Sequence, residues 1–137
     1  MADLYNHYSN VEPGSITSAT SSLRSKVRTA QQKLSSFKTS LSDSVWKANA
    51  KETLFTAFNT LDTEVDKEIL NKLSKADEVA SYISKYKTAK SNAEIYQSNL
   101  RNSNKNTPQS SIDSWRNSMA KEEQTMRDCI SSINSLI

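Results

Sequence analysis

The chain has 137 residues with one glycine, two prolines, an apolar share of 35% and a formal net charge of +3. This length fits one domain, and so few chain breakers exclude a β-rich fold, which needs turn residues every few positions. The low apolar share suits slim helices, which need only two or three apolar positions in seven, better than a large core.

The charge pattern argues against a nucleic-acid binder, which stays a third alternative through the Arg24–Lys38 face, and the apolar runs exclude a membrane-spanning protein. Basic and acidic residues are interspersed, so the concentrated basic face of a nucleic-acid binder is missing. No stretch approaches the ~18–20 apolar residues of a membrane span. Residues 1–7 lack the basic start and apolar run of a Sec signal peptide.

Residues 1–14 are predicted to form a flexible N-terminal tail, because their aromatic residues show no helical period and a Pro-Gly pair marks a turn at their end. Ser15 or Thr17 can then cap the first helix, which extends to about Leu41. Its apolar positions recur in alternating steps of three and four, so the stripe keeps facing one neighbour, as in a coiled coil. The stripe consists of Thr20, Leu23, Val27, Ala30, Leu34, Phe37 and Leu41.

Residues 42–48 are predicted to form a turn, because three cap-type residues break the heptad there. Trp46 follows them at the junction of two apolar stripes. We interpret it either as a plug that closes the end of a helical hairpin or as an exposed anchor for a partner. The first interpretation is favoured, since large aromatic side chains usually end up buried.

The second helix is predicted to extend to Leu100 from about Asn49, or from slightly earlier with Asp43 or Ser44 as its cap. Between Leu61 and Leu73 its apolar residues are four apart at every step, which shifts the seam locally, like a stutter in a coiled coil. Four residues beside the stripe widen the apolar face. Either the third helix covers this widened face, or a partner helix lies against it. The four residues are Phe55, Leu70, Val79 and Tyr82.

Residues 104–137 are predicted to form a loop and a C-terminal helix of the same domain. Ser110 or Ser111 can cap this helix after Pro108, and Cys129 lies on its apolar stripe as a buried thiol. The sequence therefore predicts an all-α fold. Residues 15–103 would form an elongated antiparallel helical hairpin with a long central helix, and the C-terminal helix would fold back on it.

No constellation of residues predicts catalysis, a cofactor or a metal site. The only histidine, His7, lies in the predicted tail, and Cys129 is far from it in sequence. The acidic residues have the spacing of a solvated helix face, and the Glu-x-x-His repeats of a carboxylate metal site are missing. We therefore expect a protein without enzymatic activity, marginally stable as a monomer, whose apolar helix face binds another protein.

The residues around the predicted turn resemble a known family. Ser44-Val45-Trp46-Lys47-Ala48-Asn49-Ala50, with heptads on either side, is similar to the turn of the Trp-X-Gly (WXG) superfamily. These are small helical-hairpin proteins of type VII secretion systems in Gram-positive bacteria. The resemblance covers about residues 15–100 and is closest to the longer members that partner LXG-domain toxins. Ala48 stands where the family has glycine, and the family's Tyr-x-x-x-Asp/Glu export signal is missing after the second helix.

This resemblance implies a non-enzymatic protein that is made in the cytoplasm and is either secreted or acts as the targeting chaperone of an LXG-type toxin. Export to the cell surface or the medium would use the type VII route. The partners would be a helical protein, either an LXG-type effector or another WXG-like protein, and the secretion machinery. Trp46 and Ala48 would form the turn motif. The expected contact residues are Trp46, Phe55, Leu70, Val79 and Tyr82.

The alternative is a structural coiled-coil protein, for example a phage or cell-surface assembly component. It would form a homodimer or a larger homo-oligomer through the same apolar stripes.

Overall fold

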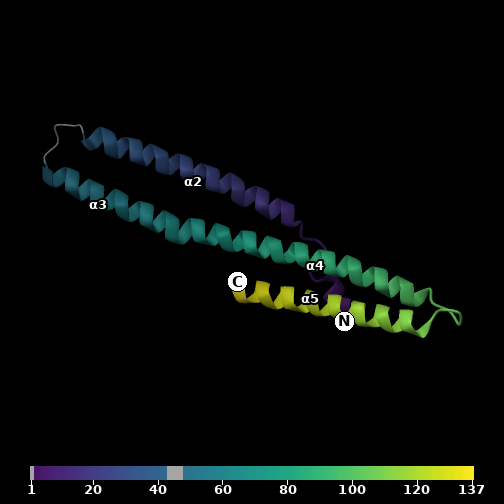
Figure 1. Cartoon of the computed structure of the whole chain (residues 1–137). Coiled ribbons are helices and arrows are strands. Elements are labelled where there is room, and N and C mark those ends of the chain that lie inside the picture. Colours follow the sequence, from purple (N-terminus) through teal and green to yellow (C-terminus); the bar gives the residue numbers. More distant parts are fainter. Residues whose placement is uncertain (1, 43–47) are drawn as a thin grey trace. The chain divides into compact units, whose positions relative to one another are not determined.

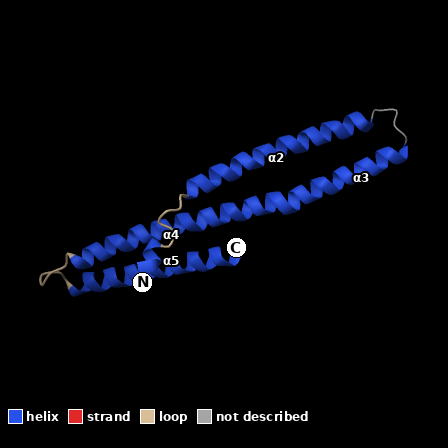
Figure 2. Ribbon diagram, turned by 180° about the vertical axis from the view of Figure 1, so that it is seen from behind, coloured by secondary structure: helices blue, strands red, loops and turns tan. Residues whose placement is uncertain are grey.

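The computed structural model describes residues 2–42 and 48–137, and every regular element in these ranges is a helix (Figure 2). The predicted all-α class is confirmed for this part of the chain. None of the helices described is long and apolar enough to cross a membrane. The elements are α1 (Ala2–Asn6), α2 (Pro13–Ser42), α3 (Ala48–Glu64), the π-helix η1 (Val65–Leu70), α4 (Asn71–Arg101) and α5 (Gln109–Leu136).

The chain divides into two compact units. The first, which we call the 15–77 unit, contains nearly all of α2, together with α3, η1 and the first turns of α4. The second, which we call the terminal unit, consists of residues 1–14 and 78–137 and contains α1, the rest of α4, and α5.

Within the 15–77 unit, α2 lies alongside α3 and η1 (Figure 1). Polar contacts between them show the direction of the helices. They join later residues of α2 to earlier residues of its neighbour, and earlier residues of α2 to later ones. The two helices are therefore antiparallel. The contacts are Lys38 Nζ to Asn59 Oδ1 at 2.7 Å, Gln31 Nε2 to Asp66 Oδ1 at 3.3 Å, and Arg24 to the Asp77 carboxylate at 2.6 Å.

The π-helix η1 lies where the apolar stripe changes its step. In an α-helix a step of four residues overshoots a full turn by about 40°. Three such steps, from Leu61 to Leu73, would therefore carry the stripe roughly a third of the way around the helix. A π-helical turn closes its hydrogen bonds over five residues and so takes up an extra residue, which limits this drift.

The terminal unit contains every buried hydrophobic side chain of the residues described. Met126 and Ile133 on α5 are wholly enclosed, and each burial contributes about 1.5–3 kcal/mol. Cys129 is buried beside them, as predicted, and this burial raises the pKa of its thiol. The buried set is Leu4, Ala80, Ile83, Tyr86, Ala89, Ala93, Met126, Cys129 and Ile133.

The N-terminal segment differs from the predicted tail, because residues 2–6 form α1 and Leu4 is buried in the terminal unit. The Tyr86 hydroxyl donates a hydrogen bond to the Leu4 carbonyl and accepts one from the His7 N–H at 3.1 Å. The Tyr5 hydroxyl donates to a carboxylate oxygen of α5 at 2.6 Å. A helix of one turn has no period to detect and depends on such tertiary contacts, which is why the sequence pattern missed it.

The helix ends differ from the predicted caps at two places. α2 begins at Pro13, before the predicted cap residues. Proline is favoured in the first turn of a helix because it has no N–H group that would need an acceptor there. α5 begins at Gln109 with Pro108 as its N-cap and no side-chain cap, so the predicted cap by Ser110 or Ser111 is wrong. The Pro108 carbonyl instead accepts the first backbone bonds of α5. Most of the predicted turn, including Trp46, lies outside the described residues.

Candidate functional site

The apolar stripe of the 15–77 unit is only half covered. Among its described side chains only one, the polar Thr20, is fully buried. Large hydrophobic side chains remain about half exposed on both helices, although they occupy the stripe that normally forms a core. Scattered exposed hydrophobic residues are ordinary, but a contiguous set on one face indicates an interaction surface. The exposed fractions are 49% for Leu23, 53% for Phe37, 51% for Leu61 and 43% for Ile69.

A mainly apolar groove of about 250 Å³ lies between α2 and the α3–η1 segment. This volume is below the ~300–1,000 Å³ of small-molecule pockets. It corresponds better to the holes into which one helix of a bundle inserts its side chains. The lining residues are Val27, Ala30, Gln31, Leu34, Leu61, Asp62, Val65 and Ile69.

The Asp62 carboxylate gives this groove a polar feature. Its Oδ2 lies 3.6 Å from Lys38 Nζ. Its Oδ1 is enclosed and accepts no hydrogen bond from the residues that the structure describes. An enclosed acceptor without a donor costs free energy, so Asp62 Oδ1 is a locally destabilising group of the 15–77 unit.

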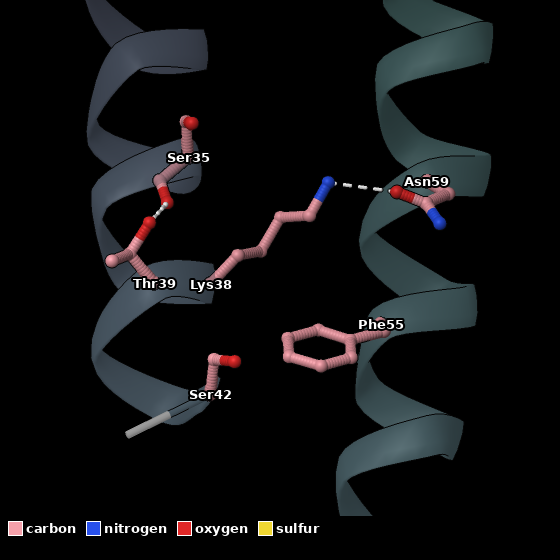
Figure 3. Close-up of a pocket in the computed structure, with 6 residues that line it drawn as sticks. All are labelled: Ser35, Lys38, Thr39, Ser42, Phe55 and Asn59. Carbon is pink, nitrogen blue, oxygen red and sulfur yellow. Dashed lines mark hydrogen bonds between the residues drawn. The ribbon is translucent and has the colours of Figure 1, made fainter. Parts of the chain in front are cut away.

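A second pocket, of about 460 Å³, lies on the polar flank of the same helices, and Figure 3 shows its lining. The Lys38 side chain reaches across from α2 to Asn59, and the Phe55 ring points from α3 toward α2. Phe55, an expected contact residue, is thus half-buried on the flank that faces α2.

The other expected contact residues are spread over the chain. Trp46 lies outside the described residues, and Ala48 is the first residue of α3. Leu70 is half-buried at the end of η1 in the 15–77 unit. Val79 and Tyr82 belong to the terminal unit, where Tyr82 packs against the buried cluster. The structure therefore does not gather the expected set on one unit.

The exposed residues on α2, α3 and η1 are ones that the sequence pattern assigned to a core stripe. Periodicity identifies residues that share a face, but it does not say how many helices cover that face. The available signal was the apolar share of 35%, which leaves little apolar surface to enclose the stripe.

We call the exposed apolar stripe that contains Leu23, Phe37, Leu61 and Ile69 the open face. The residues that border it carry a different charge on each side. α2 contains five basic residues and no acidic one, whereas η1 and the end of α3 are rich in acids. Successive residues of a helix are about 100° apart. On this geometry, Lys26 and Lys33 lie on the flank of α2 opposite Arg24, Gln31 and Lys38, the residues that contact the neighbouring helix. On α3, the flank opposite Asn59 and Asp62 carries Glu64.

A polar cluster joins α2 to the start of α4. The Thr20 hydroxyl donates to Asp77 Oδ1, and the Arg24 guanidinium lies 2.6 Å from Asp77 Oδ2. The hydrogen bond from Thr20, followed by that from Arg24, lowers the pKa of the Asp77 carboxyl. The cluster therefore fixes the register of the two helices at one end of the stripe.

Comparisons of the chain with protein-family models, with curated proteins and with solved structures find no match. Within the described part of the chain, no group of three or more His, Cys, Asp or Glu side chains could hold a metal ion. The candidate site is the open face of the 15–77 unit, because its stripe leaves large hydrophobic side chains about half exposed beside an apolar groove.

Proposed function

We propose that the chain is a non-enzymatic helical interaction protein whose 15–77 unit is completed by the helices of a partner. The observation that carries the proposal is the contrast between the two units. The terminal unit encloses large side chains such as Tyr86 and Met126, whereas the stripe of the 15–77 unit leaves Leu61 and Phe37 about half exposed.

The driving force would be burial of this stripe. Fully burying one large aliphatic or aromatic side chain contributes about 1.5–3 kcal/mol, so covering the exposed halves of four of them contributes roughly 3–6 kcal/mol. A partner helix whose side chains enter the groove would add contacts of the knobs-into-holes kind.

The sequence resemblance supports a narrower form of this proposal. The Trp46–Ala48 turn pattern and the helices on either side of it suggest a WXG-like protein of a type VII secretion system. In this form, residues 15–103 act as the antiparallel hairpin of the family, and an LXG-type toxin or another WXG-like protein supplies the partner helices. The paired helices would then be the form that the secretion machinery recognises.

Site-specific photocrosslinking in the producing cells tests the proposal. A photoreactive amino acid at Leu61 faces the open stripe, whereas the same group at Thr56 lies on the opposite side of α3 and serves as the matched control. We expect the Leu61 position to crosslink to a helical protein, identified by mass spectrometry, and the Thr56 position to remain uncrosslinked. Equal crosslinking at both positions, or none at either, contradicts the proposed interaction surface.

A further inference from the structure

We propose that residues 2–12 form a strap that opens and closes as a unit over α4 and α5, while these two helices stay packed on each other. The apolar cluster beneath the strap is uncovered only in the open state. The strap belongs to the terminal unit, so the inference is independent of the open face and of the function proposed for it.

The strap spans the two helices that it covers. α1 lies against α5 (Figure 1), and the Tyr5 hydroxyl donates a hydrogen bond to Glu123 Oε1 of α5 at 2.6 Å. At the other end of the strap, the Glu12 carboxylate lies 3.3 Å from Lys87 Nζ of α4. The strap is therefore fastened to α5 near its beginning and to α4 near its end.

The strap covers a cluster that includes Met126 and Cys129 of α5. Leu4 is part of this buried cluster, and Tyr8 packs against it. Burial, followed by the neighbouring Tyr86 and Cys129, raises the pKa of the Tyr8 hydroxyl, so Tyr8 lies close to the Cys129 thiol. Opening of the strap therefore exposes this thiol to the solvent.

Few buried contacts hold the strap in place. Among its side chains that the structure describes, Leu4 alone is buried, whereas Tyr5 and Tyr8 are partly exposed. The ion pair of Glu12 contributes little, because 74% of this side chain is exposed. α1 has five residues, far fewer than the ~12–15 that an isolated helix needs, so it has no stability without its contacts. Terminal segments of this kind open at the lowest free energy.

α4 and α5 have buried residues that the strap does not touch. The two helices are 31 and 28 residues long. Ala80, Ile83 and Ile133 are buried on them but lie outside the cluster that Leu4 joins. Opening of the strap leaves this packing intact, so it exposes less surface than unfolding of the whole terminal unit.

The strap also limits binding at the cluster that it covers. A ligand of this cluster has to displace the strap, so its apparent affinity falls in proportion to the fraction of molecules in which the strap is open. The strap is therefore an autoinhibitory contact within the chain.

The rate at which iodoacetamide alkylates Cys129 in the full chain measures this opening, because the buried thiol belongs to the only cysteine. Leu4→Ala removes the buried side chain of the strap and should raise the rate at least about tenfold. Circular dichroism should show that this variant keeps the helix content of the natural chain.

Ile133→Val is the matched control, because it weakens the packing of α5 outside the cluster that Leu4 joins. It should lower the urea midpoint of helix unfolding but change the alkylation rate less than about twofold. The rate for the natural chain should depend only weakly on low urea concentrations, since the strap exposes little surface when it opens.

Three results would overturn the strap. The first is an alkylation rate that Leu4→Ala leaves unchanged. The second is a rate that Ile133→Val raises as much as Leu4→Ala does. The third is a rate that rises with urea as steeply as helix unfolding does, because the thiol would then be reached only when the terminal unit unfolds.

Discussion

Tyr86 is the residue that ties the N-terminal segment into the terminal unit. Its side chain is fully buried, and burial raises the pKa of its hydroxyl. That hydroxyl donates to the Leu4 carbonyl and accepts from the His7 N–H, and its ring packs edge-on against Tyr8 at 5.1 Å between centroids. One side chain therefore satisfies two backbone groups of residues 4–7 and fills the space between them and the longer helices.

Replacing Tyr86 by Phe should destabilise the terminal unit by about 1–3 kcal/mol, because the buried Leu4 carbonyl and the part-buried His7 N–H lose their partner. Cys129 is the only cysteine and is buried in the same cluster, so the rate at which a thiol reagent modifies it reports opening of this unit. The rate should rise roughly 5- to 150-fold. Tyr96→Phe, at a half-buried tyrosine of α4 outside this cluster, is the control and should leave the rate nearly unchanged. Equal rates in both variants would contradict the role of the hydroxyl.

Asp77 gives the 15–77 unit a pH dependence at the acid end. Its folded-state pKa lies below the ordinary value of 3.8, because Thr20 and Arg24 stabilise the carboxylate. The resulting stabilisation is fully present above pH 3.8 and is lost as the pH falls through the lowered folded value. Asp77→Asn should therefore be less stable than the natural chain at neutral pH, and the difference should shrink in acid. A difference in urea stability that stays constant into strong acid would refute this assignment.

At the scale of elements, the π-helix compensates for the stutter in the stripe. Deleting Lys67 changes the spacing from Leu61 to Leu73 from four, four, four to four, three, four, which a plain α-helix accommodates. We expect this deletion to retain the helix content measured by circular dichroism. Deleting Thr29 from the regular part of α2 rotates the following stripe by about 100° and should cost at least about 1 kcal/mol. Comparable losses in both deletions would show that η1 does not act as the compensating turn.

Most helices could be predicted from the sequence, because long apolar stripes determine their position. α3 is described from Ala48, next to the predicted start near Asn49, and α4 ends one residue after the predicted Leu100. The apolar residues that are four apart between Leu61 and Leu73 also indicated an irregularity in the segment where η1 interrupts the helix. These features depend on local spacing, which a single sequence contains.

The remaining features depend on tertiary contacts, which a single sequence does not contain. α1 was missed because Leu4 and Tyr5 are held by residues more than 80 positions away. A partner surface was expected, but its exposed residues were not identified, because Leu61 and Ile69 have the spacing of core residues. Only the structure shows that the described helices of the 15–77 unit leave them about half exposed. Tyr82 was placed on the partner surface, yet it packs on the cluster of the terminal unit.

At the scale of the whole molecule, the two units differ in how completely they enclose their own apolar surface. The terminal unit has a closed cluster formed by α1, α4 and α5, whereas the described side chains of the 15–77 unit include no fully buried hydrophobic one. Unfolding of the chain therefore need not follow one cooperative transition, and each unit requires its own probe. It also follows that a partner stabilises mainly the 15–77 unit, through the free energy of binding.

Amide hydrogen exchange on the dilute, partner-free chain tests this central claim most directly, because it reports the stability of each helix separately. We predict that amides of α2 and α3 are protected at least about tenfold less than those around Tyr86 in α4 and Met126 in α5. Equal protection of both units in the dilute chain would contradict the account, since the 15–77 unit would then be stable without a partner.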